Sequence, residues 1–198
     1  MKRSTSARAL ATVLALSTMA LTPAASSRAT TQVSQAPAWS GAENVSTSLE
    51  VDSEAPALVV ASNGVVHLVW EEDDELYHAH RTAGVWSTPA QIPGTGSADQ
   101  PAVAPGDGGQ VHAVYADYPD IYRVSWNESA WGFPQNVSQH SVSSSDSPDL
   151  AVAEDGTLHI VAVEATSQQL CYADITGGSY APIPNAFFAG SPSVDVTG

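Results

Sequence analysis

Short apolar runs alternate with turn signals along most of this chain. Residues 57–61 (ALVVA) form a continuous apolar run, and residues 65–70 (VVHLVW) follow it after Ser-Asn-Gly. Asn-Gly supplies the positive φ of a tight hairpin, and β-branched runs of this length are typical of strands. Residues 75–81 (ELYHAHR) alternate with a period of two, and a further segment opens at Trp86 and runs to residue 92. This stretch therefore predicts four antiparallel strands.

The same order of elements recurs with a period of 44 to 50 residues. Each of the first three units carries a glycine, a histidine and an acid at fixed distances after a proline. Repeats of this length that are built from strands are typical of the blades of a β-propeller. The recurring residues are Pro56, Pro101, Pro148 and Pro192; Gly64, Gly109 and Gly156; His67, His112 and His159; and Glu72, Asp117 and Glu164.

We therefore expect an all-β, β-propeller-like fold with three complete four-stranded blades at about 54–92, 99–137 and 146–186. Residues 39–46 match an outer strand and residues 191–196 match an inner strand, so two terminal strands of a fourth blade are expected as well. This is a partial propeller, because single rings have roughly four to eight blades. Either the terminal strands close a stunted fourth blade, or the chain is a piece of a larger propeller, or self-association completes the ring. Open strand edges favour association.

The first 29 residues have the parts of a secretory signal peptide. Basic residues at the start precede a short core rich in Ala and Leu at 9–21, and small residues follow. The core is too short for a spanning helix, which needs about 20 apolar residues. We expect residues 1–29 to be removed and residues 30–198, the propeller part, to be secreted. No later stretch is apolar for long enough to cross a bilayer, so no membrane insertion is expected.

Charge and cysteine content narrow the range of partners. Removal of the leader leaves Arg81 and Arg123 against 21 acidic residues, a net charge of 2 − 21 = −19. Such a surface repels nucleic acid, so no nucleic-acid partner is expected. Cys171 is the single cysteine, which excludes an internal disulfide and a cysteine-based metal site. Its place in an apolar strand predicts a buried free thiol.

Two motifs carry a resemblance to a known family. One is Ser-Pro or Ala-Pro, an apolar run, glycine, and then Val-His-x-Val-aromatic. The other is a strand containing Tyr77 that leads to residues 84–89 (GVWSTP). From residue 39 onward the chain resembles the sialidase-like propellers with neuraminidase (Asp-box) repeats. The Asp box of that family is Ser-x-Asp-x-Gly-x-Thr-Trp, and residues 79–86 keep its Gly84 and Trp86 without the Ser and Asp.

The resemblance implies propeller blades, and it does not imply sialidase catalysis. Enzymes of that family hold a substrate carboxylate with three arginines and use a Tyr–Glu pair as the nucleophile. Three arginines neutralise and grip the carboxylate bidentately. The chain without its leader has two arginines, so we do not expect an enzyme from this chain alone.

An aromatic residue and a carboxylate share one strand face near the end of the second strand in two units. These pairs are Trp70 with Glu72 and Tyr115 with Asp117, and the third unit keeps only the acid, Glu164. A ring that covers the apolar face of a sugar, beside a carboxylate that accepts hydroxyl protons, is a common sugar-binding arrangement. The alternative is that the aromatic residues fill the space between blades and the acids are solvated.

A second acid series precedes the repeat prolines, and the histidines form a third series. Glu54, Asp99 and Asp146 either cap the turns or gather near the ring axis and bind a cation, for which calcium is the best fit. No other cofactor is expected. The repeat histidines lie one to a blade, which favours structural side chains bonded to backbone or hydroxyl groups over metal ligands.

These observations lead to one leading function and two alternatives. The leading hypothesis is a secreted, non-catalytic binding module for a glycan or another extracellular surface. One alternative is an exo-sialidase-like glycoside hydrolase that is active only as part of a complete propeller. The other is a purely structural repeat protein that serves in assembly.

Overall fold

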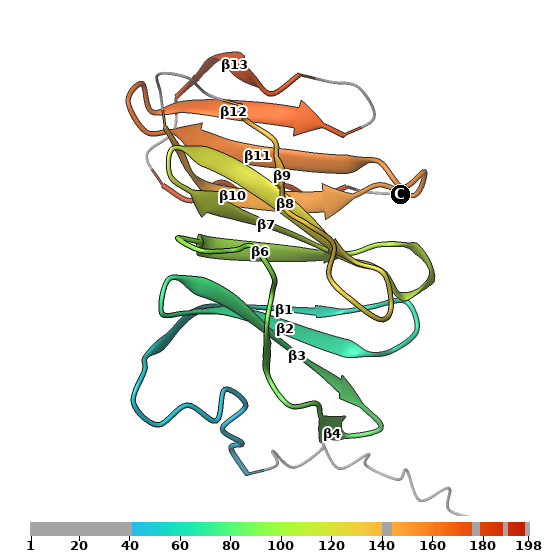
Figure 1. Cartoon of the computed structure of the whole chain (residues 1–198). Coiled ribbons are helices and arrows are strands. Elements are labelled where there is room, and N and C mark those ends of the chain that lie inside the picture. Colours follow the sequence, from blue (N-terminus) through green and yellow to red (C-terminus); the bar gives the residue numbers. More distant parts are fainter. Residues whose placement is uncertain (1–40, 140–143, 176–178, 188–189, 197–198) are drawn as a thin grey trace, which may run out of the picture. The chain divides into compact units, whose positions relative to one another are not determined.

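A computed structural model describes residues 41–139, 144–175, 179–187 and 190–196 of the chain. Its described part is built from antiparallel strands in three sheets, with one short 3-10 turn, η1 (Asp107–Gly109) (Figure 1). Sheet 1 contains β1 (Ser53–Val60), β2 (Val66–Glu72), β3 (Glu75–Thr82), β4 (Val85–Trp86) and β5 (Ala90–Gln91); sheet 2 contains β6 (Asp99–Pro105), β7 (Val111–Asp117), β8 (Asp120–Trp126) and β9 (Gln135–Asn136); sheet 3 contains β10 (Ser145–Val152), β11 (Leu158–Glu164), β12 (Gln169–Asp174) and β13 (Ala181–Phe187).

The prediction of an all-β chain with three antiparallel, blade-like sheets is confirmed. The strands pair in chain order, as in four-stranded meanders, except that β5 of sheet 1 pairs with β3. The outer strands are less regular than predicted: sheet 1 divides its outer strand into β4 and β5, and sheet 2 keeps only the bridge Trp126–Trp131 and β9. Pro89 and Pro134 interrupt these segments, because proline has no N–H to donate to a ladder.

The two terminal strands of a fourth blade are not formed in the part of the chain that the structure describes. Residues 41–46 and 190–196 contain no strand, and residues 39–40 lie outside the described part. A strand forms where a neighbouring strand satisfies its backbone hydrogen-bonding groups. No strand of the three sheets pairs with either of these two segments. The predicted boundary between residues 29 and 30 also lies outside the described residues.

The repeat proline marks a β-bulge at the start of each inner strand. The pairing register shifts between Glu54 and Ala57, and the same shift occurs at the corresponding places in β6 and β10. The residue before each proline has a positive φ. A bulge takes the proline out of the ladder, where its missing N–H has no consequence. The positive-φ residues are Ala55 (44°), Gln100 (53°) and Ser147 (51°).

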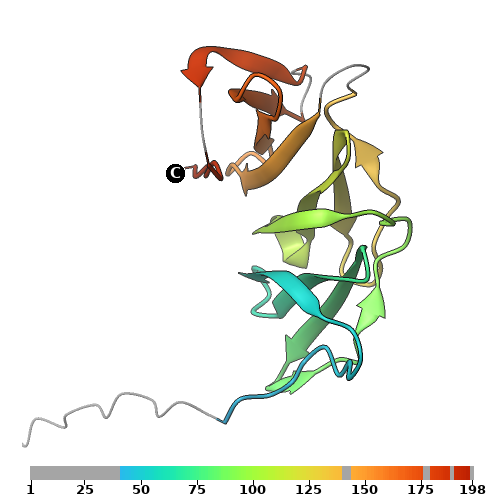
Figure 2. The same ribbon diagram turned by 90° about the vertical axis from the view of Figure 1, so that its left-hand side faces the viewer.

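The cores lie between the faces of neighbouring sheets. β6 contacts β1 on one side and β10 on the other (Figure 2). Val69 and Leu76 of sheet 1 pack with Tyr115 of sheet 2 in one buried cluster. In a second cluster, Val114 of sheet 2 packs with Ile160 of sheet 3. Each sheet therefore depends on its neighbour to bury its apolar face, as stacked repeats do.

A buried hydroxyl group ties the end of each of the first two sheets to its third strand. The backbone N–H of Leu76 donates to Thr95 Oγ1 at 3.1 Å, and that of Ile121 donates to Ser138 Oγ at 3.0 Å. Thr95 Oγ1 donates in turn to the carbonyl of Ile92 at 2.8 Å. The connection to the next sheet is thereby fixed.

Cys171 is buried and unpaired, as predicted. Among the described residues, no helix is long and apolar enough to span a membrane.

Candidate functional site

The aromatic residues of the predicted sugar platform are packed inside the chain. Trp70 is 3% exposed and Tyr115 is 0% exposed. Each ring stacks on its cross-strand partner, Trp70 on Tyr77 at 6.1 Å between centroids and Tyr115 on Tyr122 at 5.9 Å. Tyr115 also lies in the core between sheets 1 and 2. In this arrangement neither ring offers a free face to a sugar, which corrects the platform geometry expected from the sequence.

The acids that were expected beside these rings have other contacts. Glu72 Oε2 accepts hydrogen bonds from Trp70 Nε1 at 3.0 Å, Ser48 Oγ at 3.2 Å and Ser53 Oγ at 3.0 Å. Glu164 accepts one from the hydroxyl of Ser167. Burial, followed by the charge of Asp120, raises the pKa of Asp117. Glu72 therefore fastens the segment before β1 to the end of β2, which is a structural use of the carboxylate.

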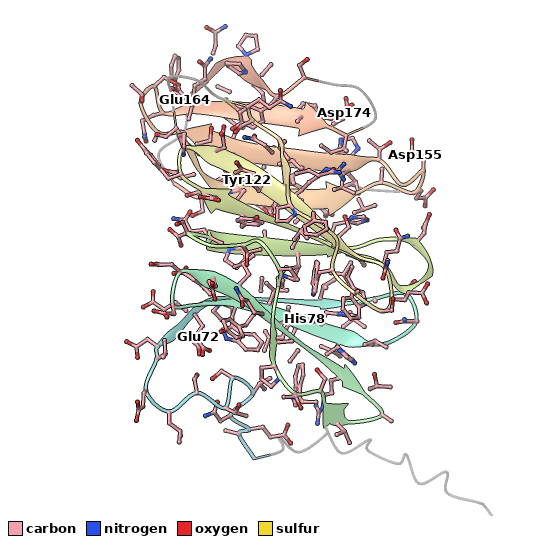
Figure 3. The ribbon with its side chains drawn as sticks, in the orientation of Figure 1. Glu72, His78, Tyr122, Asp155, Glu164 and Asp174 are labelled. Atoms are coloured by element: carbon pink, nitrogen blue, oxygen red, sulfur yellow. The ribbon has the colours of Figure 1, made fainter. Side chains whose placement is uncertain are left out.

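Both predicted acid series lie at the same end of the sheets. Pairing places the start of β1 opposite the end of β2, with Glu54 facing Glu71, and the other two sheets repeat the arrangement. We call this end the acidic end; Figure 3 shows Glu72 and Glu164 there, away from Asp155 and Asp174. Its residues are Glu54, Glu71, Glu72, Asp99, Asp117, Asp146 and Glu164.

Glu71 and Asp99 form a carboxyl pair across the junction of sheets 1 and 2. Burial, a hydrogen bond with the Asp99 side chain and the charges of Asp99, Glu54 and Asp74 raise the pKa of Glu71 to about 7. Two adjacent carboxyls share a proton because both cannot ionise cheaply at short range. Glu71 was not among the site residues predicted from the sequence, and it lies in β2. The alternation of β2, continued past Trp70, would have indicated this.

The structure does not gather the predicted calcium ligands. Glu54, Asp99 and Asp146 lie at or near the starts of three different inner strands. Among the described residues, no group of three or more His, Cys, Asp or Glu side chains is arranged to hold a metal ion.

A hollow of about 770 Å³ lies at the opposite end of the sheets, where the inner strands finish. The turns after β1, β6 and β10 supply its polar lining, and Val152 and Pro105 belong to its apolar lining. Its size falls within the range of small-ligand sites. Sequence reasoning missed this hollow, although the acids in the second and third turns were a signal that could have indicated it. The polar lining residues are Ser62, Asp107, Glu154 and Asp155.

The turns around the hollow are held in place by their own hydrogen bonds. The N–H of Gly109 donates to Ser62 Oγ at 3.0 Å, and a Cβ at Gly109, where φ is 95°, would collide with the Asn63 side chain. Glycine is therefore required where the turns of sheets 1 and 2 meet. The N–H of Thr157 donates to Asp155 Oδ1 at 2.9 Å, and hydrogen bonds from Thr157 lower the pKa of Asp155. Asp155 is thus an ionised acceptor.

Two of the three repeat histidines have the hydroxyl partners expected of structural residues. His112 Nδ1 bonds Ser125 Oγ at 2.8 Å, and His159 Nδ1 bonds the Tyr172 hydroxyl at 2.7 Å. His67 departs from this prediction, since its Nδ1 shares a hydrogen bond of 3.0 Å with His78 Nε2. The reason is local: β3 carries His78 at the position where sheet 2 has Arg123 and sheet 3 has Tyr172.

His67, His78 and His80 form a histidine cluster on the face of sheet 1 that packs against sheet 2. The His67 and His78 rings stack with centroids 5.2 Å apart, and Trp126 of sheet 2 lies 4.9 Å from the His78 ring. His67 is 1% exposed and His78 is 4% exposed. Burial, and then the charges of the neighbouring histidines, lower the pKa of His78 to about 3 and also lower that of His67. His67 and His78 are therefore uncharged at neutral pH.

No protein-family model matches the chain. No curated protein sequence matches it either. Solved structures do resemble it, beginning with a protein of unknown function from Dyadobacter fermentans DSM 18053. This likeness has a TM-score of 0.57 and 14% identity over 68% of this chain and 51% of that one.

Two further similar structures are those of enzymes that act on polysaccharides. An ulvan lyase of polysaccharide lyase family PL25 matches with a TM-score of 0.54 and 10% identity over 69% of this chain and 45% of its own. A xylan β-1,4-xylosidase from Bacillus halodurans C-125 matches with a TM-score of 0.50 and 18% identity over 68% of this chain and 31% of its own. The chain thus spans about half or less of each structure. Identities this low show the fold alone, and the resemblance to sialidase-like blades is supported only as far as blade-like sheets.

Proposed function

We propose that this protein is a secreted, non-catalytic binding module for neutral glycans, with its site in the hollow where the inner strands end. The observation that carries the proposal is the hollow of about 770 Å³, into which three successive sheets contribute Ser62, Asp107, Glu154 and Asp155. Carboxylates accept hydrogen bonds from sugar hydroxyls, and an apolar wall such as Val152 covers the C–H face of a sugar. The leader-like residues 1–29 support secretion.

The charge of the hollow favours neutral sugars over acidic ones. Its lining has three carboxylates and no basic residue among the described residues. With a net charge of −19 after loss of the leader, the whole chain adds long-range repulsion of anions. A sialic acid or uronic acid would bring a fourth carboxylate to this site without an arginine to receive it. The similarity to the folds of an ulvan lyase and a xylosidase is consistent with a carbohydrate-related role.

Binding fits the hollow better than catalysis does. Glycoside hydrolysis requires a carboxylic acid that keeps its proton near the working pH and faces the leaving oxygen. The hydrogen bonds from Thr157 lower the pKa of Asp155, so this group accepts hydrogen bonds and does not donate a proton.

Binding should be tested with residues 30–198 on an array of neutral and acidic glycans, followed by calorimetry with the best neutral ligand. Glu154→Gln and Asp107→Asn should each weaken binding about tenfold, the effect of one charged hydrogen bond in a water-accessible site. Glu128→Gln, which changes an exposed acid that does not line the hollow, serves as the matched control. Affinity that is unchanged by both hollow variants and lost in Glu72→Gln and Asp117→Asn would move the site to the acidic end. The absence of any glycan ligand would overturn the proposal.

A second candidate function, glycoside hydrolysis, rests on the Glu71–Asp99 pair. Glu71, with a pKa of about 7, has the protonation state of a general acid, and Asp99 is its ionisable neighbour. Release of nitrophenol from a panel of neutral nitrophenyl glycosides by the wild type, abolished in Glu71→Gln, would establish it. A complete lack of release across the panel between pH 5 and 8 would remove this candidate for the isolated chain.

A further inference from the structure

Arg123 is an unpaired positive charge in a strongly acidic chain. Once the leader is removed, it is one of two arginines, which face 21 acidic residues. The other, Arg81, pairs with Glu43 at 3.8 Å, whereas the Arg123 side chain makes no hydrogen bond or ion pair in the described part of the chain. Arg123 is half-buried, and burial lowers the pKa of its guanidinium. Because a charge that is partly removed from water is stabilised by an opposite charge, Arg123 is a candidate anion site.

Arg123 stands where the other two sheets have a residue that is bonded within its own sheet. Pairing with the second strand places Arg123, His78 and Tyr172 at the same position of the third strand. His78 and Tyr172 each hydrogen-bond the repeat histidine of their sheet, at 3.0 Å and 2.7 Å. In sheet 2 the repeat histidine bonds Ser125 instead, at 2.8 Å. Arg123 therefore has no such structural role in its sheet.

The outer segment of sheet 2 leaves the ladder beside Arg123. Arg123 pairs with Gln135, and the N–H of Gly132 donates to the carbonyl of Ser125 at 2.9 Å. The residues between these two points form an arch that contains Pro134, which has no N–H to donate to β8. The arch thus opens a space next to the guanidinium-bearing residue.

Two hollows adjoin Arg123. The first, of about 240 Å³, lies at the arch, and the second, of about 270 Å³, lies between β9 and the end of β12. Arg123 and Gln135 line both hollows, which together fall in the size range of small-ligand pockets, about 300–1,000 Å³. Phe133, which is 85% exposed, lines the first hollow, where no acid is found among the described lining residues. Asp174 lines the second hollow.

We propose that Arg123 binds the carboxylate of a uronic acid residue in the first hollow, with the sugar ring against Phe133. A planar guanidinium holds a carboxylate through two parallel hydrogen bonds, and an aromatic ring covers the C–H face of a sugar. One arginine balances one negative charge, which favours a carboxylate over a phosphate. Gln135 and Gln139 line the second hollow, and their amide groups suit the sugar hydroxyls. We call these residues the arginine site.

The arginine site is independent of the hollow where the inner strands end. The two share no lining residue, and the proposal does not rest on the function proposed for that hollow. Three carboxylates line the hollow of the inner strands, so it disfavours an acidic sugar. At the arginine site an acidic sugar meets a positive charge that no described residue neutralises.

Titration of isotope-labelled residues 30–198 with methyl β-D-glucuronide, followed by NMR, tests the proposal. The Arg123 guanidinium signal and the backbone amides of residues 123–133 should shift, with a Kd of about 1 mM for a ligand of this size. Methyl β-D-glucoside, the neutral twin, and acetate, a carboxylate without a ring, should each bind at least about tenfold more weakly. Arg123→Gln should raise the Kd for the glucuronide by about tenfold or more, and Arg123→Lys, which keeps the charge without the planar fork, should raise it less.

Two control variants separate the arginine site from long-range charge and from the other hollow. Arg81→Gln removes the same charge away from the site and should change the Kd by less than about twofold. Glu154→Gln should weaken binding of a neutral glycan but not of the glucuronide. Circular dichroism should show that the Arg123 variants are folded, because the side chain bonds no described residue.

Four results would overturn the proposal. One is no NMR shift at 20 mM glucuronide, and another is a Kd that Arg123→Gln leaves unchanged. A third is equal affinity for acetate or for the glucoside, which would mean an adventitious ion only or no recognition of the carboxylate. The fourth is a loss of glucuronide binding in Glu154→Gln, which would place the acidic sugar in the other hollow. Failure to bind neutral glycans, with the glucuronide still bound through Arg123, would count against the proposed function alone and would support the arginine site.

Discussion

Protonation of the histidine cluster should make the junction of sheets 1 and 2 sensitive to acid. Burial lowers the pKa of His78 to about 3, against an ordinary value of 6.5. Between these two values the unfolded chain binds a proton that the folded chain does not, so stability falls as the pH falls through this window. Each pH unit contributes about 1.36 kcal/mol, so acidification from pH 6.5 to 4.5 removes about 2 to 3 kcal/mol through His78.

The effect of His78 is isolated by comparison with a variant that lacks the titrating ring. His78→Gln keeps a side chain able to hydrogen-bond His67 Nδ1 and removes the proton-binding group. Urea unfolding followed by tryptophan fluorescence at pH 7, 6, 5 and 4.5 gives the difference in unfolding free energy between wild type and variant. That difference should shrink by about 2 kcal/mol between pH 6.5 and 4.5. Parallel curves for the two proteins, or an NMR titration midpoint for the His78 ring above pH 6, would refute the reasoning.

Three further substitutions probe other buried or coupled groups. Relative to the wild type, Glu71→Gln should have a higher unfolding free energy at pH 8 than at pH 4.5. The reason is that the raised pKa of Glu71 in the folded state stabilises the wild type at low pH, and this stability is lost as the pH rises toward 7. Equal effects at both pH values would contradict this. Tyr115→Phe should raise the unfolding free energy by about 1 kcal/mol, since the Tyr115 hydroxyl is buried and has no hydrogen-bond partner among the described residues; a loss of stability would indicate an unseen partner. Thr95→Val should cost about 1 to 3 kcal/mol by leaving the Leu76 N–H unpaired, and Thr88→Val, at an exposed position, is its control in the same melts.

The strands were predictable where a periodic pattern carried the information. β3 begins at the expected residue, Glu75, because turn residues precede a regular alternation. The outer strands were less predictable, since Pro89 and Pro134 interrupt segments whose apolar content still favours a strand. The bulge at each repeat proline was also missed, because register depends on the partner strand and not on local sequence.

The candidate site was harder to predict because equivalent residues have different neighbours. Trp70 and Tyr115 have the composition of a sugar platform, but cross-strand tyrosines cover both rings. Nothing in the sequence distinguishes a ring that faces solvent from one that faces the next sheet. The hollow draws its acids from turns such as those of Asp107 and Asp155, where acids also serve as turn formers. Its existence depends on how three sheets converge, which no single repeat encodes.

The groups with strongly shifted pKa values lie at positions where one sheet departs from the repeat, and not at the positions that all three sheets share. At the position of Glu71, sheets 2 and 3 carry Ala116 and Val163, so the carboxyl pair with Asp99 belongs to one junction. The histidine cluster breaks the repeat at the same junction, where His78 bonds His67. The carboxyl pair and the histidine cluster therefore lie at the junction of the same two sheets, and their contributions to stability respond to pH in opposite ways.

Because the two groups act in opposite directions, the unfolding free energy of the wild type measured against pH does not reveal the contribution of either group alone. Between pH 4.5 and 6.5, acidification lowers the unfolding free energy through His78 and raises it through Glu71. Solvent screening reduces the contribution of Glu71, so the two effects offset each other in part. The wild type should thus lose less stability with acid in this range than the contribution of His78 alone would give. Glu71→Gln should expose the histidine slope, and stability should then fall with acid; His78→Gln should expose the opposite slope. If both single variants keep the pH profile of the wild type, neither group titrates with a shifted pKa and the junction is not sensitive to pH.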